Sequence, residues 1–400
     1  MAIKDRIDGN SRNRKSIWYG ISINILLLGL ASFFGDVSSE MITPILPLFI
    51  ASLGGTGLMI GLIGGLGDSI AAVTRIFSGY FSDRMGRRKP LVISGYSFSA
   101  FAKLLMAFAT STWHVLILRP VERVGKGMRE PPRDALAAEC VPKRIRGKIF
   151  GVIKAMDSFG AIFGSLLALI FLYSLKMGFK SILLIAGVVA VLSTISLIFI
   201  KDVKKKPFRA GLIKGLKQLP KNFRAYLLIA TVFALADFSY MFFILKAGDY
   251  FSSYYIPVAL YVLFNLIYAL LAFPIGIWSD RVGRRKVLMG GYALFMLTCV
   301  SFVLSSNLAW FILSFALYGL TYAFIVGSER AFASDLAPRK ELGTAMGTFH
   351  TFIALATLPS SLIAGWLWQY SSHNAPFIFG AFFALIALMM LIFSRNLNKK

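Results

Sequence analysis

Cysteine, histidine and acidic side chains are all scarce in this chain of 400 residues. The 2 cysteines, Cys140 and Cys299, fall on different expected helices, and there are 3 histidines. This scarcity excludes a disulfide framework and a cluster of soft metal ligands, so we expect no metal site and no cofactor. Only 15% of the residues are charged, and 18 acidic residues stand against 43 lysines and arginines, which gives a net charge of +25.

Hydrophobic residues, by contrast, make up 57% of the chain, and the mean hydropathy is +0.71. A soluble domain of this size cannot bury so much apolar surface, so the composition predicts an all-α protein that crosses a membrane many times. The basic residues lie mainly in the expected tails and loops of one side. The positive-inside rule explains their excess without a nucleic-acid partner, and it predicts a plasma-membrane protein (inner membrane if bacterial) with both termini in the cytoplasm.

Long apolar segments divide the chain into twelve expected spans, six in each half. The first segment is too long for one crossing of about 20 residues, so we expect its start to lie along the membrane interface. The expected spans are 18–51, 57–81, 89–110, 113–139, 147–173, 178–200, 224–247, 254–279, 287–305, 308–334, 342–369 and 375–395. The expected divisions are a cytoplasmic tail at 1–16, a six-helix bundle at 17–200, a cytoplasmic linker at 201–223, a second bundle at 224–395 and a tail at 396–400.

An internal repeat relates the two halves. Residues 79–90 read GYFSDRMGRRKP, and 197 positions later residues 276–287 read GIWSDRVGRRKV. A repeat of half the chain length indicates two homologous halves. Each copy follows a long apolar run and carries several cations, which is typical of a short cytoplasmic loop between two spans.

The pattern G-x-x-x-D-R-x-G-R-R-K, after the second span of each half, resembles the signature loop of the major facilitator superfamily. The resemblance implies two pseudo-symmetric six-helix bundles around a central cavity. In that family, the aspartate and the arginines of this loop connect neighbouring helix ends and help to hold a gate. A charged loop that only sets the topology is the alternative. The implied gating residues are Gly79, Asp83, Arg84, Gly86, Arg87 and Arg88, with Asp280, Arg281, Gly283, Arg284 and Arg285 in the second half.

Two further spacings resemble motifs of the same superfamily. Gly151, Gly160 and Gly164 match part of a motif from its exporting, antiporter branches, although Ser165 stands where that motif has proline. The pattern R-x5-G-x-G that begins at Arg119 resembles a fourth-span motif whose arginine is linked to proton transfer. The first resemblance favours export.

The segment 113–139 is charged along one side. Charged side chains at the centre of a bilayer cost about 2.5–3.5 kcal/mol each, so they cannot face lipid. At 100° per residue most of the charges fall on one face, which predicts that this face lines a cavity or contacts other helices. Pro131–Pro132 predicts a kink near its end.

Acidic residues on other spans can meet these charges. Asp36 and Glu40 share one face of the first span, and Asp157 lies on the fifth. Carboxylates held close together or away from water can bind protons at neutral pH, so the cluster is a candidate for proton or substrate coupling. A static network that only holds the helices together is the alternative. The expected coupling residues are Asp36, Glu40, Arg119, Glu122, Arg123, Lys126, Asp157 and Asp237.

The second half has few charges within its spans. Asp237 is a lone acid in the middle of a span, and its expected surroundings are aromatic. Glu329 and Arg330, near the inner end of the tenth span, are expected to belong to the inner gate, whereas His350 is expected to be a packing residue.

These features predict a secondary active transporter, most simply a monomer in the lipid bilayer. It would move a small organic solute, with anionic or zwitterionic solutes slightly favoured, by alternating access, with proton coupling and in the direction of export. A proton-coupled metabolite or sugar importer and a divalent metal exporter are alternatives. A non-transporting receptor fits poorly with the charges of the fourth span, and no enzyme motif is present, so we expect no enzyme.

Overall fold

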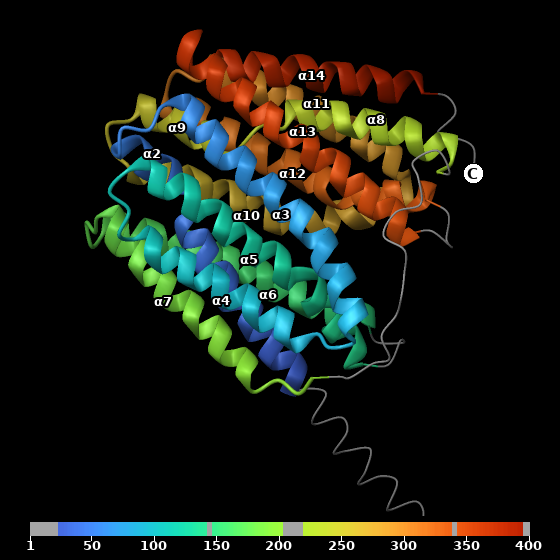
Figure 1. Ribbon diagram of the computed structural model, residues 1–400. Coiled ribbons are helices and arrows are strands. Elements are labelled where there is room, and N and C mark those ends of the chain that lie inside the picture. The colour runs from blue at the N-terminus through green and yellow to red at the C-terminus, as the bar shows by residue number, and fades with distance from the viewer. Residues whose placement is uncertain (1–22, 142–145, 203–218, 338–341, 395–400) are drawn as a thin grey trace, which may run out of the picture.

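The regular elements of the computed structural model are all α-helices over the residues that it describes (Figure 1). Ten helical segments of this part of the chain are long and apolar enough to cross a membrane. The prediction of an all-helical integral membrane protein is therefore confirmed. The expected tails and most of the expected linker lie outside the described residues, which are 23–141, 146–202, 219–337 and 342–394.

The helices follow the expected spans closely. The first half contains a helix at residues 23–42, then α2 (Leu46–Ser52), α3 (Gly57–Met85), α4 (Lys89–Met106), α5 (Thr112–Glu139), α6 (Arg146–Tyr173) and α7 (Phe179–Ile198). The second half contains α8 (Lys221–Ala236), α9 (Met241–Tyr250), α10 (Tyr255–Val282), α11 (Arg284–Leu304), α12 (Leu308–Leu336), α13 (Leu342–Tyr370) and α14 (Ala375–Phe393).

Two expected spans are each divided into two helices. The span expected at 18–51 breaks at residues 43–45, where Pro44 and Pro47 remove backbone donors. The span expected at 224–247 breaks between α8 and α9, beginning at Asp237 and without a proline. The 197-residue offset carries Glu40 onto Asp237, so the two breaks fall at nearly the same place in the repeat. The two halves therefore share the helix break as well as the repeated sequence.

Hydropathy does not identify α4 and α5 as spans, although both are long helices. The charges of α5 lower its hydropathy, and α5 continues through Pro131 and Pro132, where we expected a kink, to Glu139. The helix α4 packs against α5 on one side and α7 on the other. Both helices thus lie within the helical assembly despite their composition.

The helices of each half pack mainly with one another. In the first half, α3 contacts α5, and α4 contacts α5 and α7; in the second, α11 contacts α12 and α14, and α10 contacts α12. Figure 1 shows α4, α5 and α7 together on one side and α8, α11 and α14 on the other. The principal contacts between the halves are α3 with α13 and α6 with α10.

Glycines allow the backbones of α3 and α13 to touch. A Cβ at Gly61 would lie 2.2 Å from the carbonyl oxygen of Ser361, and a Cβ at Gly365 would lie 2.6 Å from that of Gly57. Small residues permit such close helix packing in membranes. This contact joins the two halves at the end of the molecule that holds residues 53–56, which we call the closed end. The opposite end, with the two signature loops, is called the motif end.

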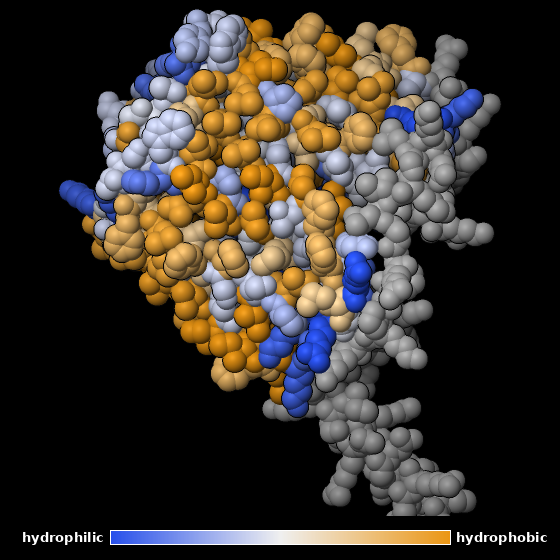
Figure 2. Space-filling model, in the orientation of Figure 1, coloured by the Kyte–Doolittle hydropathy of each residue, from blue (hydrophilic) through white to orange (hydrophobic). Residues whose placement is uncertain are grey.

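The surface between the two ends is largely apolar. Figure 2 shows hydrophobic residues across the middle of one face, with hydrophilic residues towards the edges. Large exposed side chains include Phe101, Phe108, Phe199, Phe273 and Phe393. An exposed apolar surface of this extent fits a lipid environment.

The α3–α13 contact predicts the effect of a small substitution. Gly61→Ala places a methyl group against the backbone of α13. We expect the free energy of unfolding to fall by about 1–3 kcal/mol, which is typical of overpacking. Thermal unfolding of the purified protein in detergent should show a lower melting temperature. Gly327→Ala is the matched control, because nothing lies within 4 Å of its added Cβ. Equal melting temperatures for the two variants would contradict the backbone contact.

Candidate functional site

Three cavities share lining residues; two of them lie between helices of the two halves, and the third lies within the second half. The outer cavity has a volume of about 550 Å³, and its lining includes Arg75, Lys126 and Arg330. The middle cavity, of about 250 Å³, shares Arg75 and Arg330 with it. An inner recess of about 70 Å³ shares Glu329 and Ile353 with the middle cavity. The series therefore leads from helix segments near the motif end into the second half.

The charges of the outer cavity are partly paired. Arg75 on α3 and Glu130 on α5 form an ion pair of 2.5 Å, and Arg133 lies 2.9 Å from Asp134 and 3.4 Å from Asp157 on α6. No ion pair joins three further cations of the lining to a carboxylate among the described residues: Lys126, Lys154 and Arg330. The lining therefore has an excess of positive charge.

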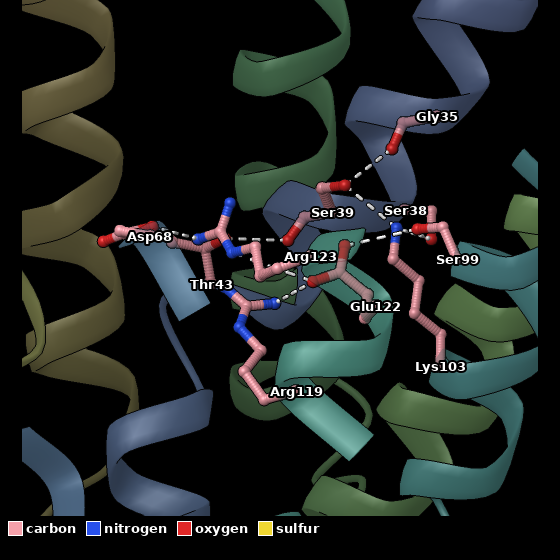
Figure 3. A network of polar contacts seen from close by, with 10 residues as sticks. All are labelled: Gly35, Ser38, Ser39, Thr43, Asp68, Ser99, Lys103, Arg119, Glu122 and Arg123. Carbon is pink, nitrogen blue, oxygen red and sulfur yellow. Dashed lines mark hydrogen bonds and ion pairs between the residues drawn. The ribbon is translucent and has the colours of Figure 1, made fainter. Parts of the chain in front are cut away.

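A buried polar network lies deeper, around the middle of α5 (Figure 3). Arg119 and Glu122 form an ion pair of 2.9 Å, and their side chains are 2% and 1% exposed. Arg123 lies 3.2 Å from Asp68 on α3 and 3.8 Å from Glu122. Ser99 on α4 donates to Glu122 at 3.3 Å. The charged side of α5 thus faces other helices, as its composition predicts.

Sequence reasoning did not single out Lys103, which belongs to this region. Its side chain is fully buried in α4, and its Nζ donates to the hydroxyls of Ser38 and Ser39 at 3.0 and 2.9 Å (Figure 3). Both serines lie on helix 23–42. The signal in the sequence is a lysine on the same helical face as Ser99, one turn away, within an apolar segment.

Glu40 lies apart from the network and contacts the other half. Its Oε2 accepts a hydrogen bond of 2.9 Å from Tyr261 and one of 3.4 Å from Asn265, both on α10. Asp36, the other acid of helix 23–42, lies against Gly160 of α6, whose added Cβ would be 3.2 Å from that of Asp36. The expected single cluster is therefore distributed over separate places, and Glu40 joins the two halves.

Asp237 occupies the helix break of the second half. The hydroxyl of Tyr322 donates to its Oδ1 at 3.2 Å, and Tyr318 donates to Tyr322 at 3.4 Å. Asp237 and Glu329 both line the inner recess together with the aromatic rings of Phe233, Phe295 and Tyr322. The sequence predicted an aromatic environment for Asp237, but it placed Glu329 in the inner gate only.

Several polar side chains around the first signature loop contact Arg88, and we call this group the Arg88 hub. The guanidinium group lies 2.5 Å from Asp83 and 3.3 Å from Glu139 at the end of α5, and it also donates to Ser82. Gly86, which ends α3, has a φ of 62°, a left-handed conformation that favours glycine. Gly79 lies near Pro131 of α5, whereas Arg84 and Arg87 are exposed.

The second signature loop repeats this arrangement with a different arginine. Arg284 lies 3.2 Å from Asp280 and 2.7 Å from Asp335 at the end of α12. Arg285 donates to the carbonyl of Leu391 at 2.6 Å, while Arg281 is exposed. Gly283 has a φ of 103°. Each loop therefore connects helix ends of its own half.

Comparisons with known proteins show which family has this arrangement of helices. A profile of the Major Facilitator Superfamily matches residues 28–262 and 227–400. An uncharacterized MFS-type transporter from Methanocaldococcus jannaschii is 42% identical over 384 residues, which are 93% of this chain and 95% of that protein. The multidrug resistance protein MdtH from Cronobacter sakazakii is 26% identical over 335 residues, 80% of each chain.

Solved structures share the fold at low sequence identity. The POT family transporter PepTSo has a TM-score of 0.78 at 14% identity and covers 94% of this chain and 98% of its own. A bacterial homolog of the human lysosomal transporter Spinster, in an inward-facing and occupied conformation, has a TM-score of 0.75 at 14% identity and covers 92% and 95%.

The helices, their apolar surface and the internal cavities define a polytopic membrane protein of the transporter type. The profile match and the archaeal relative assign it more narrowly, and the chain belongs to the Major Facilitator Superfamily.

The buried network predicts a large cost for removing one of its charges. Glu122→Gln leaves Arg119 without its carboxylate in a buried site, so we expect a loss of about 3–5 kcal/mol of stability. Asp134→Asn is the control, because the side chain of Asp134 is 48% exposed and such pairs contribute about 0–1 kcal/mol. Thermal unfolding in detergent compares the two. A variant Glu122→Gln as stable as Asp134→Asn would show that the network is not structurally important.

The Arg88 hub predicts a conformational effect at the motif end. Asp83→Asn removes one of the two carboxylates at Arg88, so the balance between inward- and outward-facing states should shift. Double electron–electron resonance between spin labels at Phe81 and Trp278, which are exposed on α3 and α10, measures the separation of the halves. Unchanged distance distributions would show that the first signature loop does not act in gating. Asp249→Asn on α9 serves as the control, and it should leave the distances unaltered.

Proposed function

We propose that this protein is a secondary active transporter that moves a small organic solute across the membrane by alternating access. The observation that carries the proposal is the series of cavities between helices of the two halves, combined with their close contact at the closed end. A carrier needs such an internal site with access from one side at a time.

The moving parts in this proposal are two bundles of six spans, at residues 17–200 and 224–395. The 197-residue repeat, the matching helix breaks and the packing of α3–α7 and α10–α14 within each half support this division. The proposal counts α4 and α5 as spans, because the buried ion pairs of α5 avoid lipid and α4 packs between α5 and α7. The linker 201–223 would join the bundles on the cytoplasmic side.

The structure, in this proposal, corresponds to the inward-facing state. The basic residues of the signature loops and of the linker support a cytoplasmic position for the motif end under the positive-inside rule. The outer cavity lies in that part of the molecule, whereas α3 and α13 touch at the closed end. Rocking of the bundles would separate α3 from α13 and close the outer cavity.

Glu40 supports proton coupling. An ionised carboxylate accepts hydrogen bonds about twice as strong as those of a neutral group, so ionised Glu40 holds Tyr261 and Asn265 of the other half more firmly than protonated Glu40. Proton binding at Glu40 is thereby linked to the contact between the bundles, and a proton gradient can bias the exchange between states. Arg119, Arg123 and Lys126 remain part of the proposed coupling region.

Two observations support export and an anionic or zwitterionic solute. Relatives that cover most of this chain carry the name Multidrug resistance protein MdtH. The outer cavity contains three cations that form no ion pair with a carboxylate of the described residues, Lys126, Lys154 and Arg330, and they would attract an anionic group of the solute. The proposal therefore assigns the outer cavity to recognition of negative charge.

Proteoliposomes loaded with a pH-sensitive dye test the proposal. Solutes from a panel of anions, zwitterions and organic cations are added to the wild type, and at least one should cause proton movement. Glu40→Gln should abolish this movement and retain solute binding, because the glutamine cannot exchange a proton. Tyr261→Phe should alter only its pH dependence, and Tyr250→Phe, whose hydroxyl bonds Ser306 at the closed end, should change neither. Wild-type proton coupling in Glu40→Gln would place the proton site elsewhere.

A further inference from the structure

We propose that the inner recess binds the positively charged ammonium group of the transported solute, between Asp237, Glu329 and the aromatic rings beside them. The inference rests on the proposed transport function and specifies which chemical group enters which cavity. It complements the cation-rich outer cavity, so that a solute with both groups would be oriented along the series of cavities.

The carboxylates of the recess form no ion pair within the part of the chain that the structure describes. Neither Asp237 nor Glu329 lies within ion-pair distance of a cation among these residues, in contrast to the paired acids of the outer cavity. Arg330 follows Glu329 directly but lines the middle and outer cavities and not the recess. Two acids that line one cavity without a cation repel each other, and a bound cation would relieve that repulsion.

The helix break adds negative potential at the same place. The helix α8 ends at Ala236, and Asp237 is its C-cap residue. A helix C-terminus carries the equivalent of about half a negative charge and favours cations within its last turn. Ala234, also in this last turn, lines the recess with Asp237. Backbone and side chain thus contribute charge of the same sign.

The aromatic walls suit an ammonium group that carries carbon substituents. Phe233 and Phe295 line the recess, and Phe233 is held by stacking on Tyr292 with 4.0 Å between ring centroids. Tyr322 lines the recess and donates its hydroxyl hydrogen to Asp237. Rings attract cations through their faces, and such contacts are strongest where water is excluded. Alkylated ammonium groups therefore fit better than hydrated inorganic ions.

The sizes of the two cavities indicate which part of the solute each one can hold. The recess of about 70 Å³ has room for a head group and not for a whole organic molecule. The middle cavity of about 250 Å³ adjoins it through Glu329 and Ile353, and Phe349 and His350 are among its lining residues. The rest of the solute would occupy the middle cavity, which is also lined by Arg75 and Arg330, while the ammonium group enters the recess.

Binding of tritiated benzyltrimethylammonium to the purified full-length protein tests the assignment. Scintillation proximity in detergent should show saturable binding to the wild type. Asp237→Asn and Glu329→Gln should each weaken affinity about tenfold or more, as expected for a desolvated charge contact. Unlabelled benzyltrimethylammonium should displace the probe, whereas neopentylbenzene, in which carbon replaces the charged nitrogen, should not.

Asp249→Asn is the matched control, since Asp249 lies on the other helix of the break, paired with His373 at 2.6 Å and outside the recess. It should retain wild-type affinity. Absence of saturable binding, unchanged affinity in both recess variants with unchanged melting temperature, or equal displacement by neopentylbenzene would overturn the assignment. Failure of transport is a separate result: a wild type that binds the probe but moves no solute in proteoliposomes would overturn the proposed function and leave the recess as a binding site.

Discussion

The cost of placing charge inside a membrane governs this structure. A helix as charged as α5 is stable in that environment only if its polar side contacts partners or water, and the surrounding helices are arranged to provide both. Arg119, Glu122 and Arg123 are compensated by side chains of α3 and α4, while the charges nearer the motif end line the outer cavity. The electrostatic requirement of one helix thereby fixes the positions of its neighbours.

The two halves accommodate their buried charges differently, although they are copies of one repeat. The first half carries a dense set of compensated charges, whereas the second has isolated acids in an aromatic environment. Both have a break in their first span, at residues 43–45 just after Glu40 in the first half and from Asp237 in the second, and Glu40 and Asp237 are equivalent in the repeat. A symmetric scaffold thus presents chemically distinct walls to the same interior, and this asymmetry lets one cavity series recognise unlike groups at its two ends.

Hydropathy and the repeated loop were sufficient to predict most of the membrane-spanning helices and the family, because both depend on local patterns along the chain. The prediction that the charged side of α5 turns inward followed from the same energetic rule. The partners of Glu40 could not be predicted, since Tyr261 and Asn265 lie on a helix of the other half and no local pattern connects them. Lys103 was missed because its partners are hydroxyls, which carry no charge to mark them. The break at Asp237 has no proline and therefore no local signal.

The glycine contact between α3 and α13 has a thermodynamic consequence. Glycine has no side chain to immobilise, so bringing these backbones together costs little rotamer entropy, and separating them releases little. Side chains of ordinary size at this contact would make the closed arrangement progressively less favourable on warming. With glycines there, the preference between the two arrangements depends mainly on polar contacts such as that of Glu40, and we expect it to change little over a wide range of temperature.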